Sequence, residues 1–122
     1  MKPTRKLSTG NLFGAPEAPL SGEVFTDLLR CQNVRIERIV SSERPEPTLH
    51  DQKQDEWVCL LQGEADLWLN GKRIALCAGD HVFIPAHTPH RVLRTSGHPP
   101  CIWLAVHIHP GHQGTNADPD IG

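Results

Sequence analysis

The sequence predicts a single all-β domain, and three features of its 122 residues support this prediction. Short segments with alternating apolar and polar residues recur along the chain. Clusters of glycine, proline, asparagine and aspartate separate these segments at the regular spacing of successive short strands. No segment has the apolar spacing of an amphipathic helix. Such a pattern is typical of a sandwich, a jelly roll or a small barrel.

Composition argues against several classes of protein. The net charge is −2 and the basic residues form no stripe with interleaved aromatics, so we expect no nucleic-acid partner. No apolar run is long enough to cross a membrane, and residues 1–14 lack the apolar segment of a signal peptide. The four cysteines form no CxxC pair, which favours reduced thiols in a cytoplasmic protein over disulfides or a structural zinc site.

We expect three parts along the chain: an irregular N-terminal arm at residues 1–22, a β-barrel domain at residues 23–110 and a flexible tail at residues 111–122. The arm is expected to cover the domain or a partner subunit. The expected strands lie at residues 23–29, 32–41, 56–62, 65–69, 72–76, 81–85, 90–93 and 101–109. The first of these segments would also suit one helical turn.

The dipeptide Asn70-Gly71 is the clearest hairpin signal. A two-residue turn here pairs Leu67 with Ile74, and the next pair on the same face is also apolar, so this face should meet the core. Gly63 precedes the hairpin and indicates a bend or bulge.

Four polar residues form the candidate metal site. His50, Gln52 and Glu56 have the same parity, so in extended chain their side chains would share one strand face. His90 opens a strand after a proline and should point inward, whereas His87 has the opposite parity and should point out.

Two imidazoles and one carboxylate can occupy one face of a metal ion and leave the rest open to a ligand and water. His50, Glu56 and His90 are therefore the expected ligands of a divalent transition metal ion, which could be iron, manganese, nickel, cobalt or zinc. Gln52 would either add a weak amide-oxygen ligand or bind the substrate by a hydrogen bond. No catalytic residue is assigned.

The last expected strand carries His107 and His109 on one face and only aliphatic residues, from Ile102 to Ile108, on the other. Because the second face is uniformly apolar, we expect it to meet the core, with the histidines at a subunit interface or in solvent. With the opposite rotation of the strand, His107 would line the pocket and bind the substrate.

Two stretches resemble the paired motifs of the cupin family. Residues 50–63 read H-x-Q-x3-E-x6-G, similar to the first cupin motif, G-x5-H-x-H-x3-4-E-x6-G. Residues 79–90 read G-x5-P-x-H-x2-H, similar to the second, G-x5-P-x-G-x2-H-x3-N. The resemblance covers roughly residues 34–109.

The resemblance implies a single-domain jelly-roll β-barrel, often dimeric, that holds a metal ion in the barrel. By position, His50 and Glu56 match the first motif and His90 matches the second. The chain departs from the motifs at Gln52, which replaces a histidine, and at three further positions, Arg44, His87 and Arg94.

Two functions fit these observations. The first is a metal-dependent enzyme acting on a small oxygen-bearing molecule, for which dioxygenase, isomerase and lyase chemistry fit equally. The second is a non-catalytic ligand-binding or sensor protein, which the glutamine at position 52 favours. A third and weaker possibility is a structural or interaction protein, in which the outer faces of Trp57 and Trp68 contact a second copy or another partner. The expected partners are a small-molecule ligand and a second copy of the chain.

Overall fold

The computed structural model describes residues 6–15 and 17–111, and within these ranges it contains eight strands and no helix. The strands are β1 (Glu23–Cys31), β2 (Val34–Ser41), β3 (Asp55–Gln62), β4 (Glu64–Leu69), β5 (Lys72–Cys77), β6 (His81–Ile84), β7 (His90–Thr95) and β8 (Cys101–Ile108). The all-β prediction is confirmed, and the first segment is a strand rather than a helical turn. Of the predicted tail, residues 111–122, all but Gly111 lies outside the described residues.

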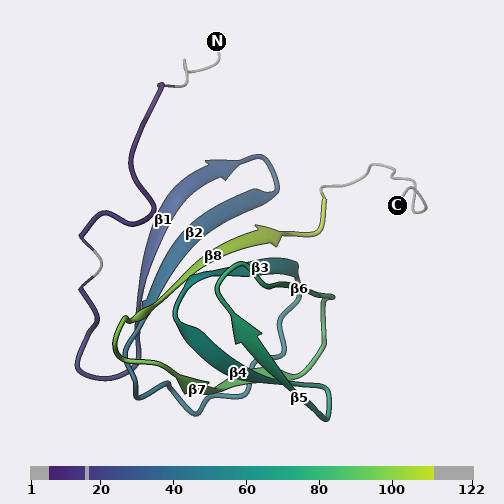
Figure 1. Cartoon of the computed structure of the whole chain (residues 1–122). Coiled ribbons are helices and arrows are strands. Elements are labelled where there is room, and N and C mark those ends of the chain that lie inside the picture. The colour runs from purple at the N-terminus through teal and green to yellow at the C-terminus, as the bar shows by residue number, and fades with distance from the viewer. Residues whose placement is uncertain (1–5, 16, 112–122) are drawn as a thin grey trace.

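The strands form two antiparallel sheets that face each other (Figure 1). The order of the larger sheet is β1-β2-β8-β3-β6, and that of the smaller sheet is β5-β4-β7. The chain passes from one sheet to the other between β3 and β4, between β5 and β6, between β6 and β7, and between β7 and β8. This is the predicted jelly-roll arrangement, in which the inner faces of both sheets share one interior.

The predicted hairpin is present in the predicted register. Leu67 of β4 pairs with Ile74 of β5. Asn70 and Gly71 both have positive φ, 45° and 94°, as a two-residue turn of the type that suits twisted strands requires.

Gly63 occupies the bend at which the chain leaves the larger sheet. A register shift between Leu60 and Gln62 precedes it, and its φ is 95°. A Cβ atom at this position would lie 2.8 Å from the Cys101 Sγ atom, so only glycine fits without a shift of the neighbouring strand. The bend predicted at this position is therefore confirmed.

The hydrophobic core lies between the two sheets. Leu60 and Ala65, from opposite sheets, are completely buried. The other core members are Val58, Leu67, Leu76, Ile84, Cys101, Trp103 and Ala105. Side chains of both sheets thus hold the two layers together.

The expected orientation of the last strand is wrong. The inward face of β8 carries Cys101, Trp103, Ala105 and His107, each no more than 4% exposed, whereas Ile108 on the aliphatic face is 38% exposed. β8 is the central strand of the larger sheet, and Ile102 on its outer face is also fully buried. When both faces of a strand are partly covered, apolar residues occur on both and do not reveal which face is inner.

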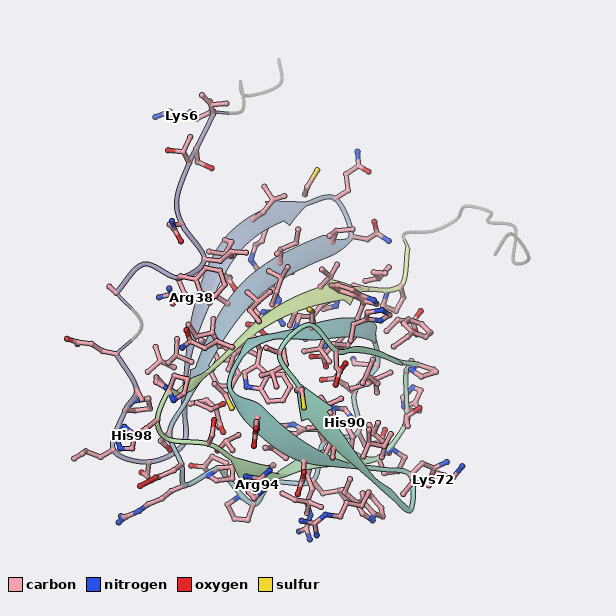
Figure 2. The ribbon with its side chains drawn as sticks, viewed as in Figure 1. Lys6, Arg38, Lys72, His90, Arg94 and His98 are labelled. Carbon is pink, nitrogen blue, oxygen red and sulfur yellow. The ribbon has the colours of Figure 1, made fainter. Side chains whose placement is uncertain are left out.

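The described part of the N-terminal arm contains neither helix nor strand. The guanidinium of Arg38, on the outer face of β2, donates hydrogen bonds to the carbonyl oxygens of Leu12 (3.1 Å) and Gly14 (2.6 Å) (Figure 2). These bonds tie the arm to the larger sheet. Among the described residues, no helix is long and apolar enough to span a membrane.

Candidate metal and ligand site

A pocket of about 290 Å³ lies between the inner faces of the two sheets. Three groups of polar residues line it, together with apolar core side chains such as Val58 and Trp103. A small-molecule site of this kind is concave, largely apolar and fitted with a few convergent polar groups.

The first group contains all four residues of the predicted metal site. His50, Gln52, Glu56 and His90 all line the pocket. Figure 2 shows the labelled His90 between the two sheets. The expected inward orientation of His90 is confirmed, since it is only 9% exposed.

His50 reaches the pocket by a different route from the one predicted. It does not lie on the same strand as Glu56, because β3 begins at Asp55 and residues 51–54 are not in a strand. Instead His50 forms a β-bridge with His90, in which each backbone N–H donates to the other's carbonyl oxygen (2.8 and 3.0 Å). The two rings stack with their centroids 5.5 Å apart. His50 therefore does not share a strand face with Glu56 as predicted, although both residues line one pocket.

Glu56 connects the members of this group. The Gln52 Nε2 atom donates to Glu56 Oε1 at 2.7 Å, and His90 Nε2 lies 3.9 Å from the same oxygen. His90 Nδ1 lies 2.8 Å from the Thr88 carbonyl oxygen, which can only accept, so Nδ1 carries a proton. In the neutral ring Nε2 is then unprotonated and available to a metal ion.

The electrostatic surroundings of His50 favour its neutral form. Partial burial lowers its pKa, and the neighbouring His90 lowers it further, while Glu56 acts in the opposite direction. A neutral imidazole is the form that binds a metal ion.

The donor set of this group fits a divalent transition metal ion, because it offers two imidazoles, a carboxylate and an amide. Within the described ranges, however, no three histidine, cysteine, aspartate or glutamate side chains converge closely enough to hold one as they stand. His50, Glu56 and His90 share a pocket, and side-chain rotation would be needed to bring them onto one ion.

A second polar group, which the sequence did not reveal as a unit, lies on β2 and β8. His107 Nε2 is 2.8 Å from Glu37 Oε2, and Arg35 donates to Glu37 Oε1 at 2.7 Å. Gln54 Nε2 is 3.2 Å from His107 Nδ1. All four side chains line the pocket, so His107 takes the alternative position rather than the solvent or interface position that was favoured.

In this second group Glu37 is the acceptor of the hydrogen bonds from both His107 and Arg35. Burial raises the pKa of Glu37, but the hydrogen bonds from His107 and Arg35 outweigh this, and the pKa is lowered overall. An ionised Glu37 accepts from both partners, so His107 Nε2 carries a proton. In the neutral ring Nδ1 is then unprotonated and can accept from the amide of Gln54, which lies 3.2 Å away.

Glu23, the third polar element, lies at the edge strand β1 opposite Ser41 of β2 and lines the pocket. Burial and the nearby carboxylate of Glu46 raise its pKa, although a hydrogen bond from the Glu46 backbone partly opposes them. Like Arg35, Glu37 and Gln54, it was missed by the sequence analysis. For Arg35 and Glu37 the available signal was the alternation of charged and apolar residues in β2, a strand that pairs with the central strand β8. No such signal marked Glu23 on the edge strand or Gln54 outside the strands.

The remaining described histidines lie outside the pocket. His87 is exposed, has a φ of 62° and lies 3.2 Å from the Asp51 carboxylate, which confirms its expected outward position. His81 stacks on Trp57 on the outer face of the larger sheet. His112 lies outside the described residues.

Comparison with protein families matches residues 36–107, more than half of the chain, to the cupin domain. A solved structure from Ralstonia eutropha JMP134, named as a candidate mannose-6-phosphate isomerase, is 36% identical. Its TM-score is 0.78, and the alignment covers 85% of this chain and 100% of that one. No curated protein matches the sequence significantly.

Two further structures show the same fold at lower identity. A Streptococcus pyogenes protein of unknown function is 17% identical with a TM-score of 0.73, over 89% of this chain and 93% of that one. A cupin superfamily protein of Desulfitobacterium hafniense DCB-2 is 19% identical with a TM-score of 0.71, over 89% of this chain and 100% of that one.

Proposed function

The chain belongs to the cupin family, and on that premise we propose that its pocket binds a divalent transition metal ion together with a small oxygen-bearing molecule. One observation carries the proposal: His50, Glu56 and His90, which come from three separate segments, line the same pocket. Two imidazoles and a carboxylate leave part of a metal ion open to a further ligand.

In this proposal His50 and His90 hold the metal ion through neutral imidazole nitrogens and Glu56 holds it through a carboxylate oxygen. Gln52 contributes an amide oxygen or binds the ligand directly. When bound, the metal ion would act as a Lewis acid on an oxygen atom of the ligand. The choice among iron, manganese, nickel, cobalt and zinc is not set by these donor types.

His107 and Gln54 orient the ligand on the other side of the same pocket. Arg35 and Glu37 hold His107 in the tautomer with its proton on Nε2. Nδ1 is then the acceptor, and a ligand hydroxyl that displaced the Gln54 amide could donate to it. A positioned acceptor beside a Lewis acid suits proton transfer at a carbon next to an oxygen-bearing carbon, which is the chemistry of isomerases and lyases.

A second candidate function is ligand binding without catalysis. It is favoured by the hydrogen bond from Gln52 to Glu56, because an amide that donates to the carboxylate occupies an oxygen that the metal ion would need. A binder should be stabilised against heat by its ligand, without product formation and without sensitivity to chelators.

Metal content and turnover separate these possibilities. Protein purified without a histidine tag should contain close to one transition metal ion per chain by elemental analysis. D-Mannose 6-phosphate and D-mannose are the first substrates to test together, since the protein that is 36% identical is named as a candidate mannose-6-phosphate isomerase. Ketose formation that stops on chelation and returns on metal addition would support the enzyme. Binding without product would support the second candidate.

We also infer that two copies of the chain associate through β1. This strand is an edge of the larger sheet, and its apolar side chains are 42–60% exposed: Val24, Phe25, Leu28 and Leu29. An edge strand of nine residues with exposed apolar groups favours pairing with a second copy. Light scattering should give a dimer for the natural chain and a monomer for Leu29→Arg.

A further inference from the structure

The carboxylate of Glu23 has a buried oxygen atom without a partner. Glu23 Oε2 is covered and accepts no hydrogen bond from the described residues. The residue as a whole is half-buried, and a rotation of its side chain would present this oxygen to a ligand in the pocket. Glu23 lies on β1 opposite Ser41 and lines the pocket. Buried polar atoms almost always have a hydrogen-bond partner, and leaving one without is costly, so a donor is missing at this point.

The pocket lining contains more acidic than basic side chains. Glu23, Glu37 and Glu56 line it, and the one cation among its described lining residues, Arg35, is already engaged by Glu37 (2.7 Å) and Asp27 (3.3 Å). Arg35 also lies six residues along β2 from Ser41, which is roughly 20 Å in an extended strand. Glu23 therefore has no cation of the pocket near it, and a phosphate or carboxylate would be repelled there.

The two glutamines of the pocket present acceptors as well. Gln52 donates its amide hydrogen to Glu56, and Gln54 donates to His107. A side-chain amide has its donors and its acceptor on different atoms, so both glutamines keep their carbonyl oxygens for a ligand. Acceptors are thus distributed along the pocket, and a ligand that satisfies them needs several separate donors. Hydroxyl groups on one carbon skeleton meet this need better than a single ammonium group.

Apolar side chains line the same pocket as these acceptors. Phe25, Ile39 and Trp103 line the pocket on the same inner face as Glu23. They would cover the C–H faces of a carbon skeleton while the acceptors receive its hydroxyls.

We propose that Glu23 accepts a hydrogen bond from a hydroxyl group of an uncharged polyhydroxylated ligand, and that the pocket thereby selects a neutral polyol or sugar over its phosphorylated counterpart. This inference rests on the proposed function in one respect, that this pocket is the ligand site. It does not require the metal ion.

The test is titration calorimetry of the full chain with three matched pairs of probes. These are D-mannose, D-glucose and glycerol against D-mannose 6-phosphate, D-glucose 6-phosphate and glycerol 3-phosphate. At least one neutral probe should bind tenfold or more tightly than its phosphorylated counterpart. Glu23→Gln should weaken that binding at least fivefold. The control is Glu64→Gln, an equal charge change at an exposed residue that does not line the pocket, and it should stay within twofold.

Three results would overturn the inference: no neutral probe binds, each phosphorylated probe binds as tightly as its neutral partner or more so, or Glu23→Gln and Glu64→Gln have equal effects. Circular dichroism spectra and melting curves of both variants check that they are folded. Elemental analysis of the same samples keeps the two proposals apart. Absence of metal with Glu23-dependent sugar binding refutes only the metal site, whereas metal binding with no sugar discrimination refutes only the role of Glu23.

Discussion

His107 and Glu37 form a buried hydrogen bond in the wall of the pocket, with His107 Nε2 2.8 Å from Glu37 Oε2 and both side chains only 5–6% exposed. Arg35 donates to the other oxygen of the same carboxylate, so Glu37 is held from two sides. A buried charge is retained at low cost only where such partners satisfy it. This arrangement fixes which nitrogen of His107 carries the proton.

Glu37→Gln should destabilise the fold and allow the His107 ring to adopt both of its neutral tautomers. The amide cannot accept from both partners as a carboxylate does, and hydrogen bonds to charged groups are each worth about 1.5–3 kcal/mol. We expect a loss of about 2–3 kcal/mol in the free energy of unfolding, measured with urea. The ¹⁵N chemical shifts of the His107 ring should show a proton on Nε2 in the natural chain and a mixture of tautomers in the variant. Unchanged shifts would mean that Glu37 does not position His107.

The lowered pKa of Glu37 allows the pH dependence of stability to be predicted. Burial alone would raise the pKa of Glu37, but its hydrogen bonds with His107 and Arg35 lower the pKa in the folded state below its unfolded value. Its contribution is therefore fully present above the unfolded pKa of about 4.3 and is lost as the pH falls through the folded-state pKa. The stability gap between the natural chain and Glu37→Gln should be large at about pH 7 and should shrink at about pH 3. A gap that does not change with pH would contradict this account.

Leu60 tests whether the core between the sheets is packed as described. Its side chain is 0% exposed, and truncation of a buried leucine leaves a cavity that costs about 2–5 kcal/mol. Leu60→Ala should lower the free energy of unfolding by that amount. Leu49→Ala is the matched control, because Leu49 is 56% exposed and its truncation should change stability by less than about 0.5 kcal/mol.

The local sequence was sufficient to predict strand orientation where one face of a strand is polar, and to predict a turn where its geometry requires particular residues. Asn70-Gly71 predicted both the hairpin and its register because few other residues adopt positive φ there. It was insufficient for β8, where Ile102 on the outer face is as completely buried as Ala105 on the inner one. In such a central strand the pairing with neighbours, and not the alternation, decides which way His107 points.

In the candidate site, too, the local sequence predicted which residues take part but not the long-range contacts that place them. The four predicted polar residues do line one pocket, but His50 is held there by backbone hydrogen bonds with His90. Those bonds join residues forty positions apart, so no local period could reveal them. The partnership of Glu37 with His107 is likewise long-range and depends on the pairing of β2 with β8.

Substitutions of Gln52 should change the affinity of the pocket for a transition metal ion. A neutral amide is a weak donor to transition metal ions, and its hydrogen bond to Glu56 holds an oxygen that the metal ion would use. Gln52→His should raise the affinity for Ni²⁺ or Zn²⁺ at least tenfold by calorimetry. Gln52→Ala should change it by less than about fivefold, since one weak donor is lost while Glu56 is released. Equal affinities for Gln52→His and Gln52→Ala would indicate that position 52 does not face the metal ion.

The central claim is that His50, Glu56 and His90 hold one metal ion, and elemental analysis of tag-free protein tests it most directly. We predict close to one transition metal ion per chain in the natural protein and in His87→Ala, whose side chain lies outside the pocket. His50→Ala and His90→Ala, shown to be folded by circular dichroism, should each contain almost none. A natural chain that takes up no metal ion after incubation with iron, manganese, cobalt, nickel and zinc salts would contradict the claim, as would variants that retain the full metal content.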